Sequence, residues 1–441
     1  MDNSRKIAVE ILNDVINKNA YSNIVLNNKL NNSNLFDIDK GLTTEIVYGT
    51  LKYMYSIDKM LDCYLKNGIK KLDEYILNIL RIGIYQLNYL DKIPEFAAVN
   101  ECVELAKERS KGGSKLVNGV LRNFLRNKNK IYYKNTELDK VCFEYSFPKW
   151  LTQLFIKQYG IDDAIKILYG LNQVPTVTVR VNNLKGDYED IWRKLIENGY
   201  NIEQGSVCPE AIKIVRGKNI ENNPIFKEGL ITVQDESAML VASTMEIEDN
   251  IYVLDLCSAP GGKTTHIAEL LDNTGSIFAF DIHKNKLSLV KDNASRLGIK
   301  NIHLNVMDAC IYKEKYKEFA DRILIDVPCS GLGIIRKKPE IKYTKNKNDL
   351  KSIIQVQRKI LLNASKYVKN NGIILYSTCT LNKEENEENI KWFIKEHPEF
   401  KIEPIFYGNL ENIKYDNMGT VTILPDKSMD GFFIAKLKKQ W

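Results

Sequence analysis

The segment IYVLDLCSAPGGKTTHIAELL, residues 251–271, decides the fold of the second half of the chain. A short apolar run leads into a loop with two adjacent glycines, and a helical pattern begins directly after it. Gly261 and Gly262 leave room for a ligand close to the backbone, and the first N–H groups of the following helix have no partner within the helix. This order predicts a ligand site at the carboxyl end of a strand in a doubly wound sheet.

The remainder of this half repeats the alternation of strand and helix. Further strands are predicted at 276–282, 301–306, 322–328 and 372–378. Helical stretches lie between them, which predicts an α/β Rossmann-like parallel sheet. Two final strands, GTVTILP (419–425) and DGFFIAKLK (430–438), predict an antiparallel edge.

The first half of the chain has other patterns. Apolar residues recur at helical spacing through the first ~140 residues, for example in LDEYILNILRIGIYQLNYL (72–90). A mixture of short strands and helices follows, beginning with TVTVRV (176–181), and predicts a small α+β domain. We therefore expect three domains, over 1–140 (all-helical), 141–245 (a linker helix and the α+β domain) and 246–441 (the α/β domain).

The glycine loop fits neither common phosphate-binding motif. A Walker A loop would need a glycine where Cys257 stands, and no G-x-G-x-x-G follows the strand. Carboxylates instead end the next strands: Asp281 is placed to bind a ribose diol, Asp308 to face an adenine, and Asp326 ends the fourth strand. Together these features predict a nucleoside cofactor.

Two cysteines follow neighbouring strands. Cys329 lies in DVPCSG and Cys379 in STCT, so we expect both thiols at the same rim of the sheet. Such a pair suits methylation of cytosine at C5, because a thiolate that adds to C6 makes C5 nucleophilic and a second group must then help to release the product. Asp326 could hold the N3/N4 edge of the base. The spacing alone does not rank the two cysteines.

Composition narrows the class of protein further. The formal charge is +7 and the pI about 8.7, which permits a polyanionic partner. The eight cysteines form no C-x-x-C pair and the four histidines are scattered, so we expect no metal site. No apolar run is long enough to cross a membrane and no secretion signal is evident, so we expect a cytoplasmic protein.

Basic residues in two segments are predicted to contact RNA phosphates. Arg122 and Arg126 lie off the apolar stripe of the helix predicted in KLVNGVLRNFLRNKNK (115–130). Arg336, Lys337 and Lys342 follow the Cys329 loop. Further on, Asn382 and Glu385 have the spacing of a capping box, so we interpret that glutamate as a structural helix start.

The motifs CSAPGGKT, DVPCSG, STCT followed by EEN, and DGFFIAKL resemble those of the NOL1/NOP2/Sun family of RNA 5-methylcytosine methyltransferases. The resemblance covers about 150–441 and implies an RRM-like α+β subdomain before the catalytic domain. It also implies that Cys379 is the nucleophile and that Cys329 assists release. The same resemblance implies S-adenosylmethionine (SAM) as cofactor, bound by Cys257, Ser258, Ala259, Pro260, Gly261, Gly262, Lys263, Asp281, Asp308 and Asp326. One departure is STCT where many members have STCS.

The first ~140 residues resemble the helical, RNA-binding NusB fold, through RIGIYQL, PEFAAVNECVELAK and KLVNGVLRNFLR. The resemblance of a NusB-like domain joined to this catalytic domain implies an enzyme that acts on 16S ribosomal RNA, either free or in early small-subunit particles. We expect this enzyme to be a monomer. Two alternatives stay open: the same chemistry on tRNA or 23S rRNA, or an RNA-binding assembly or antitermination factor without catalysis.

Overall fold

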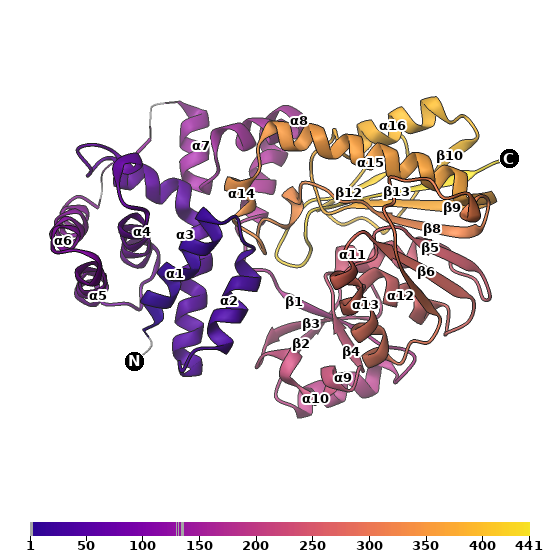
Figure 1. Cartoon of the computed structure of the whole chain (residues 1–441), viewed down its shortest axis with the longest axis horizontal. Coiled ribbons are helices and arrows are strands. Elements are labelled where there is room, and N and C mark those ends of the chain that lie inside the picture. Colours follow the sequence, from indigo (N-terminus) through magenta and orange to yellow (C-terminus); the bar gives the residue numbers. More distant parts are fainter. Residues whose placement is uncertain (1–2, 129, 131, 134–135) are drawn as a thin grey trace. The chain divides into compact units, whose positions relative to one another are not determined.

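The computed structural model describes residues 3–128, 130, 132–133 and 136–441 (Figure 1). The chain divides into two compact units: Met1–Asn172 with Ile335–Lys345, and Gln173–Ile334 with Asn346–Trp441. None of the helices formed by the described residues has the length and apolar character that a membrane crossing requires. The domain boundaries expected near residues 140 and 245 stay predictions.

The first unit is helical, as the sequence predicts (Figure 1). Its elements are α1 (Ser4–Asn17), α2 (Ser22–Asn31), α3 (Asp37–Asp62), η1 (Ile69–Lys71), α4 (Glu74–Tyr89), α5 (Glu95–Arg109), α6 (Lys111–Arg126), α7 (Glu137–Tyr145), α8 (Lys149–Gly170) and α14 (Ile341–Thr344).

Helix α4 forms the centre of this unit. Every residue from Ile76 to Leu87 is buried, and α4 packs on α1, α3, α5 and α6. Its start is fixed by Asp73, whose carboxylate accepts a hydrogen bond of 3.1 Å from the N–H of Ile76. Helix α6 is amphipathic as expected: Val117, Val120 and Phe124 are buried, whereas Arg122 and Arg126 are exposed.

Residues 335–345 lie between two parts of the catalytic half in sequence, yet they pack into the helical unit. The carboxylate of Glu340 accepts hydrogen bonds from the N–H (3.0 Å) and hydroxyl (2.8 Å) of Ser22. The ammonium of Lys342 donates to the carbonyl oxygens of Lys52 (3.0 Å) and Ser146 (3.1 Å). It also donates to Oδ1 of Asn172 at 3.0 Å. These contacts anchor the segment, here called the anchor segment, in the interior of the unit.

The second unit begins with a four-stranded antiparallel sheet in the order β2-β3-β1-β4. Its elements are β1 (Val177–Val181), α9 (Tyr188–Glu197), β2 (Asn201–Gln204), β3 (Ala211–Arg216), η2 (Ile220–Asn222), α10 (Pro224–Lys227) and β4 (Ile231–Val233), followed by α11 (Glu236–Ser243). Val179, Ile191, Leu195, Ile212 and Ile231 are members of its small apolar core.

The remainder of the second unit is a larger mixed sheet in the order β11-β12-β13-β9-β8-β5-β6-β7, with β10 paired to β13. Its elements are β5 (Tyr252–Asp255), α12 (Gly262–Leu270), β6 (Ser276–Asp281), α13 (Lys284–Leu297), β7 (Ile302–Val306), η3 (Glu314–Tyr316), β8 (Ala320–Asp326), η4 (Leu332–Ile334), α15 (Lys347–Tyr367), β9 (Val368–Thr378), α16 (Glu387–Glu396), β10 (Phe400–Glu403), β11 (Ile413–Tyr415), β12 (Val421–Ile423) and β13 (Phe432–Lys439).

The pairing in this sheet agrees with the predicted doubly wound fold. Strands β5 to β9 pair in parallel, and β13 is antiparallel to β9 and β12. One face packs on α11, α12 and α13 through side chains such as Met239 and Ile267. The other packs on α15 and α16, where Leu361 and Phe393 are buried (Figure 1). The carboxyl ends of β5 to β9 therefore share one edge, where the candidate site lies.

Candidate active site

The two predicted cysteines meet at this edge. Strands β8 and β9 are parallel neighbours, and Asp326 lies opposite Ser377 at their ends. The loop after each strand carries one thiol, and the Sγ atoms of Cys329 and Cys379 are 3.2 Å apart. At this distance, a substrate atom bonded to one sulfur is also within reach of the other thiol.

Cys329 is held as a neutral thiol. Its hydrogen bond with the sulfur of Cys379, together with its burial, raises the pKa of Cys329 well above the ordinary value for a cysteine. The negative charges of Glu385 and Asp326 act in the same direction. Burial and the neighbouring negative charges therefore favour the protonated form of Cys329.

Asp326 forms an ion pair beside the cysteines. One carboxylate oxygen lies 2.6 Å from the ammonium of Lys263, and the other accepts a hydrogen bond of 2.8 Å from the hydroxyl of Ser377. Burial alone would lower the pKa of Lys263, but the charge and hydrogen bond of Asp326 raise it above its ordinary value. The site thus holds an ion pair between Asp326 and Lys263 next to the two thiols.

The glycine loop has the geometry expected of a ligand cradle. Gly261 has φ +104°, and a Cβ atom there would come within 3.0–3.3 Å of three atoms of Val290. Helix α12 begins at Gly262. Below the loop, Asp255 accepts a hydrogen bond of 2.6 Å from the hydroxyl of Thr264, and burial raises the pKa of Asp255 to about 7. A glycine at 261 thus suits both the left-handed backbone and the close contact with Val290, and the hydrogen bond between Thr264 and Asp255 fixes the first turn of α12.

Asp281 ends β6 and Asp308 follows β7, at the same edge as the glycine loop. Each carboxylate accepts a hydrogen bond of 2.8 Å from the N–H two residues further on, that of His283 and that of Cys310. Both aspartates are half-buried. The donor set therefore fits SAM: an open glycine loop for a close approach to the backbone and acidic groups at the ends of adjacent strands.

Arg180 in β1 was not predicted as a site residue, yet its buried side chain contacts the backbone of the glycine loop. Its side chain is buried and donates to both carboxylate oxygens of Glu269 at 2.9 and 2.7 Å. It also donates to the carbonyl oxygen of Gly262 at 3.0 Å and to the side chain of Gln234. The small sheet is therefore joined to the end of α12 by a buried ion pair with Glu269 and to its start by the hydrogen bond to Gly262.

Glu385 corrects a sequence-based interpretation. The predicted helix start at Asn382 is wrong, because α16 begins at Glu387. Glu385 is fully buried, and its carboxylate accepts hydrogen bonds from the N–H (2.9 Å) and hydroxyl (2.5 Å) of Ser330 and from the amide of Gln357 (3.0 Å). Glu385 thus fixes the residue next to Cys329, a long-range contact that helix-capping rules cannot detect.

We expect Glu385→Ala to destabilise the second unit by about 2–4 kcal/mol, because it removes a buried carboxylate that accepts hydrogen bonds from Ser330, Gln357 and Asn382. Glu384→Ala is the matched control, since the Glu384 side chain is exposed, and should change the free energy of unfolding by less than about 0.5 kcal/mol. Urea unfolding of the full chain measures both. Equal effects of the two substitutions would show that the contacts of Glu385 with Ser330 and Gln357 do not stabilise the loop.

The basic residues that were predicted to contact RNA differ in their exposure to solvent. Lys342 is buried in the helical unit by the contacts described above, and burial lowers its pKa well below the ordinary value. Arg336 is also buried, whereas Lys337 is half-buried. The prediction that Lys342 and Arg336 contact RNA is therefore wrong in this structure, because neither side chain reaches the surface.

Comparison with known proteins gives the family. A family model described as 16S rRNA methyltransferase RsmB/F matches residues 242–438, the NusB family matches 2–126, and an RsmF/B-like ferredoxin-like domain matches 147–221. The probable ribosomal RNA small subunit methyltransferase B of Bacillus subtilis is 39% identical over 99% of this chain and 98% of its own length. The chain belongs to the RsmB family.

Another RsmB relative supports the same family, and solved structures support the fold. Ribosomal RNA small subunit methyltransferase B of Proteus mirabilis is 31% identical over 99% of both chains. The crystal structure of PH0851 matches 100% of this chain and 99% of its own with a TM-score of 0.85 and 28% identity. NSun6 from Pyrococcus horikoshii, solved with SFG, covers 67% of this chain and 99% of its own with a TM-score of 0.60 and 26% identity. The predicted combination of a helical NusB-like domain, a small α+β domain and a methyltransferase domain is therefore confirmed, and the α+β domain matches a ferredoxin-like family model.

Proposed function

We propose that this RsmB-family methyltransferase transfers a methyl group to C5 of one cytosine in 16S rRNA through a covalent enzyme–RNA adduct. The observation that carries the proposal is the pair of thiols 3.2 Å apart, beside the Asp326–Lys263 ion pair and at the same sheet edge as the glycine loop. RNA is preferred to another substrate because relatives that match nearly the whole chain are named for it.

In the proposed mechanism, the thiolate sulfur of Cys379 adds to C6 of the cytosine, and the electron pair of the C5–C6 double bond makes C5 nucleophilic. Asp326 accepts a hydrogen bond from the N4 amino group at the N3/N4 edge of the base and orients the ring. Lys263 forms an ion pair with that carboxylate. SAM, bound by the glycine loop, supplies an electrophilic methyl group.

Release completes the proposed mechanism. A base removes the C5 proton, the C–H electron pair restores the C5–C6 double bond, and Cys379 leaves C6 as a thiolate. Cys329 lies at hydrogen-bond distance from the sulfur of Cys379, so it is close to the adduct. We assign it to this step: its thiol first passes its proton to solvent, and the resulting thiolate takes the C5 proton while Cys379 leaves.

Deletion of the gene is expected to remove one 5-methylcytosine from 16S rRNA. Bisulfite sequencing of total RNA should show one 16S cytosine that becomes fully convertible in the deletion strain. A plasmid with the wild-type gene should restore its protection, and a plasmid with Cys379→Ala should not. An unchanged 16S pattern would contradict the substrate assignment, and a lost signal in tRNA or 23S rRNA would replace it.

A further inference from the structure

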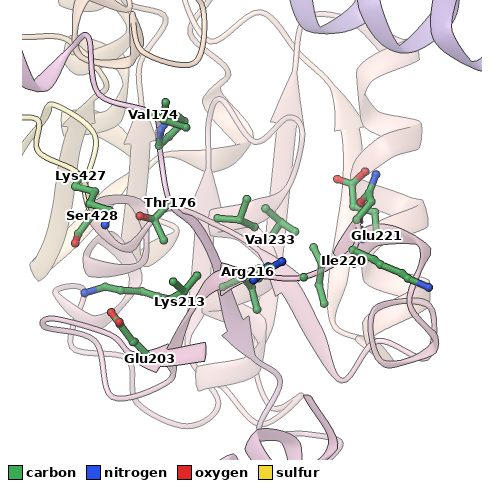
Figure 2. A pocket seen from close by; sticks show the side chains of 17 residues that line it. Val174, Thr176, Glu203, Lys213, Arg216, Ile220, Glu221, Val233, Lys427 and Ser428 are labelled. Atoms are coloured by element: carbon green, nitrogen blue, oxygen red, sulfur yellow. Dashed lines mark hydrogen bonds between the residues drawn. The ribbon is translucent and has the colours of Figure 1, made fainter. Parts of the chain in front are cut away.

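A groove outside the cysteine site lies at one end of the four-stranded sheet of the second unit (Figure 2). Its walls come from the start of β1, the end of β3, the end of β4 and the loop before β13. Its volume is about 800 Å³, which is within the range of sites that hold a small organic ligand. None of the catalytic residues described above lines it.

The groove has an exposed apolar surface. Four valines that line it are exposed, by 74% for Val174, 43% for Val177, 47% for Val215 and 41% for Val233. Val174 and Val233 are labelled among the lining side chains in Figure 2. Because exposed aliphatic side chains grouped in one concave surface mark binding sites, this surface is suited to the flat faces of a ligand such as nucleobases.

Three cations surround this apolar surface. Arg216, Lys218 and Lys427 are exposed and line the groove. Among the described residues, none of these three side chains takes part in a hydrogen bond or ion pair. The acidic residues of the lining are Glu203 and Glu221, so free positive charge exceeds negative charge there, and the groove is complementary to an anion.

The groove is connected to the cysteine site by a short loop. The carbonyl oxygen of Lys427 accepts a hydrogen bond of 3.2 Å from the N–H of Thr176, at the groove. Four residues later, Gly431 donates to the carbonyl oxygen of Gly333 at 2.9 Å, and Gly333 donates to that of Cys379 at 2.9 Å. Four residues span at most about 14 Å, so one polymer could occupy both sites.

We propose that this groove binds single-stranded RNA next to the target cytosine, with bases against the valines and phosphates at Arg216, Lys218 and Lys427. The proposal rests on the proposed function only in that RNA is the substrate. Single-stranded RNA is preferred to a duplex because its unstacked bases can reach an apolar surface, and positively charged grooves that follow the backbone are typical of single-strand binding.

The test compares two triple variants of the full chain. The first, Arg216→Ala/Lys218→Ala/Lys427→Ala, removes the cations of the groove. The second, Lys291→Ala/Lys300→Ala/Lys317→Ala, removes three exposed cations elsewhere in the same unit. Fluorescence anisotropy with a short labelled single-stranded RNA that contains one cytosine gives the Kd, and thermal unfolding checks that both variants are folded.

We expect the groove variant to raise the Kd about tenfold at moderate salt and to reduce the slope of log Kd against log salt by up to about 2, since three phosphate contacts are lost. The control variant should keep the wild-type Kd within about twofold and keep its slope. Val215→Ser/Val233→Ser should raise the Kd without any change of slope, because it removes apolar contacts only.

Equal Kd values for the groove variant and the wild type would overturn the proposal, as would equal losses in the groove and control variants. An unchanged Kd in the valine variant would also overturn it, since bases would then not lie in the groove. The binding assay needs no methyl transfer. Failure of the proposed function would instead appear as wild-type protein that binds RNA without methylating it, so the two failures are distinguishable.

Discussion

Cys379→Ala is expected to abolish methyl transfer to RNA, with a loss of at least about 10⁴-fold in rate. Without the sulfur of Cys379 nothing adds to C6, and C5 of cytosine is too weak a nucleophile to accept the methyl group. The side chain of Cys379 is partly exposed at the end of β9, so the substitution should leave the fold intact. The measurement is incorporation of tritiated methyl groups into 16S rRNA from a deletion strain.

Cys63→Ala is the matched control, since it removes an exposed thiol of the helical unit and should retain full activity. Cys379→Ala should also keep the wild-type Kd for single-stranded RNA, because the proposed groove is unchanged. Methyl transfer by Cys379→Ala at more than about one-tenth of the wild-type rate would contradict its role as nucleophile, because loss of a covalent nucleophile costs orders of magnitude more.

Cys329→Ala is expected to trap the enzyme on its substrate. The attacking sulfur is still present, so the adduct forms and the methyl group is transferred. Release slows by about 10²–10⁴-fold, the usual contribution of a positioned acid or base. A denaturing gel of protein incubated with SAM and 16S rRNA should show a new, slowly migrating band that nuclease treatment removes.

The double variant Cys329→Ala/Cys379→Ala separates this adduct from adventitious crosslinks, because it should give no such band. A second comparison is Glu385→Ala, which leaves the thiol of Cys329 present but removes the carboxylate that holds Ser330. It should accumulate less adduct than Cys329→Ala. Normal turnover by Cys329→Ala, with no band, would show that Cys329 has no part in release.

Much of the catalytic half was predictable because its signals are local. The order of strand, glycine loop and helix gave the parallel sheet, and the carboxyl ends of β8 and β9 gave the common position of Cys329 and Cys379. The strand β2, Asn201–Gln204, was missed because only Ile202 of its four residues is buried, so no alternating apolar pattern marks it.

The residues whose roles were missed or wrongly predicted from the sequence make contacts with residues that are far away along the chain. Arg180 pairs with Glu269 and Glu385 holds Ser330, and nothing in the sequence near either residue indicates its partner. Lys342 stands in a run of basic residues that is typical of an exposed RNA-binding loop. Only the tertiary structure shows that carbonyl oxygens of the helical unit surround its ammonium group.

The anchor segment also determines when the helical unit can be completed during synthesis. A growing chain folds from its N-terminus as it leaves the ribosome, so Ser22 and Ser146 emerge before any residue of Gln173–Ile334. Their partners Glu340 and Lys342 emerge only after that whole stretch. The helical unit therefore acquires its last buried contacts after the glycine loop and Cys329 have been made, and the folding of the two units is interleaved in time.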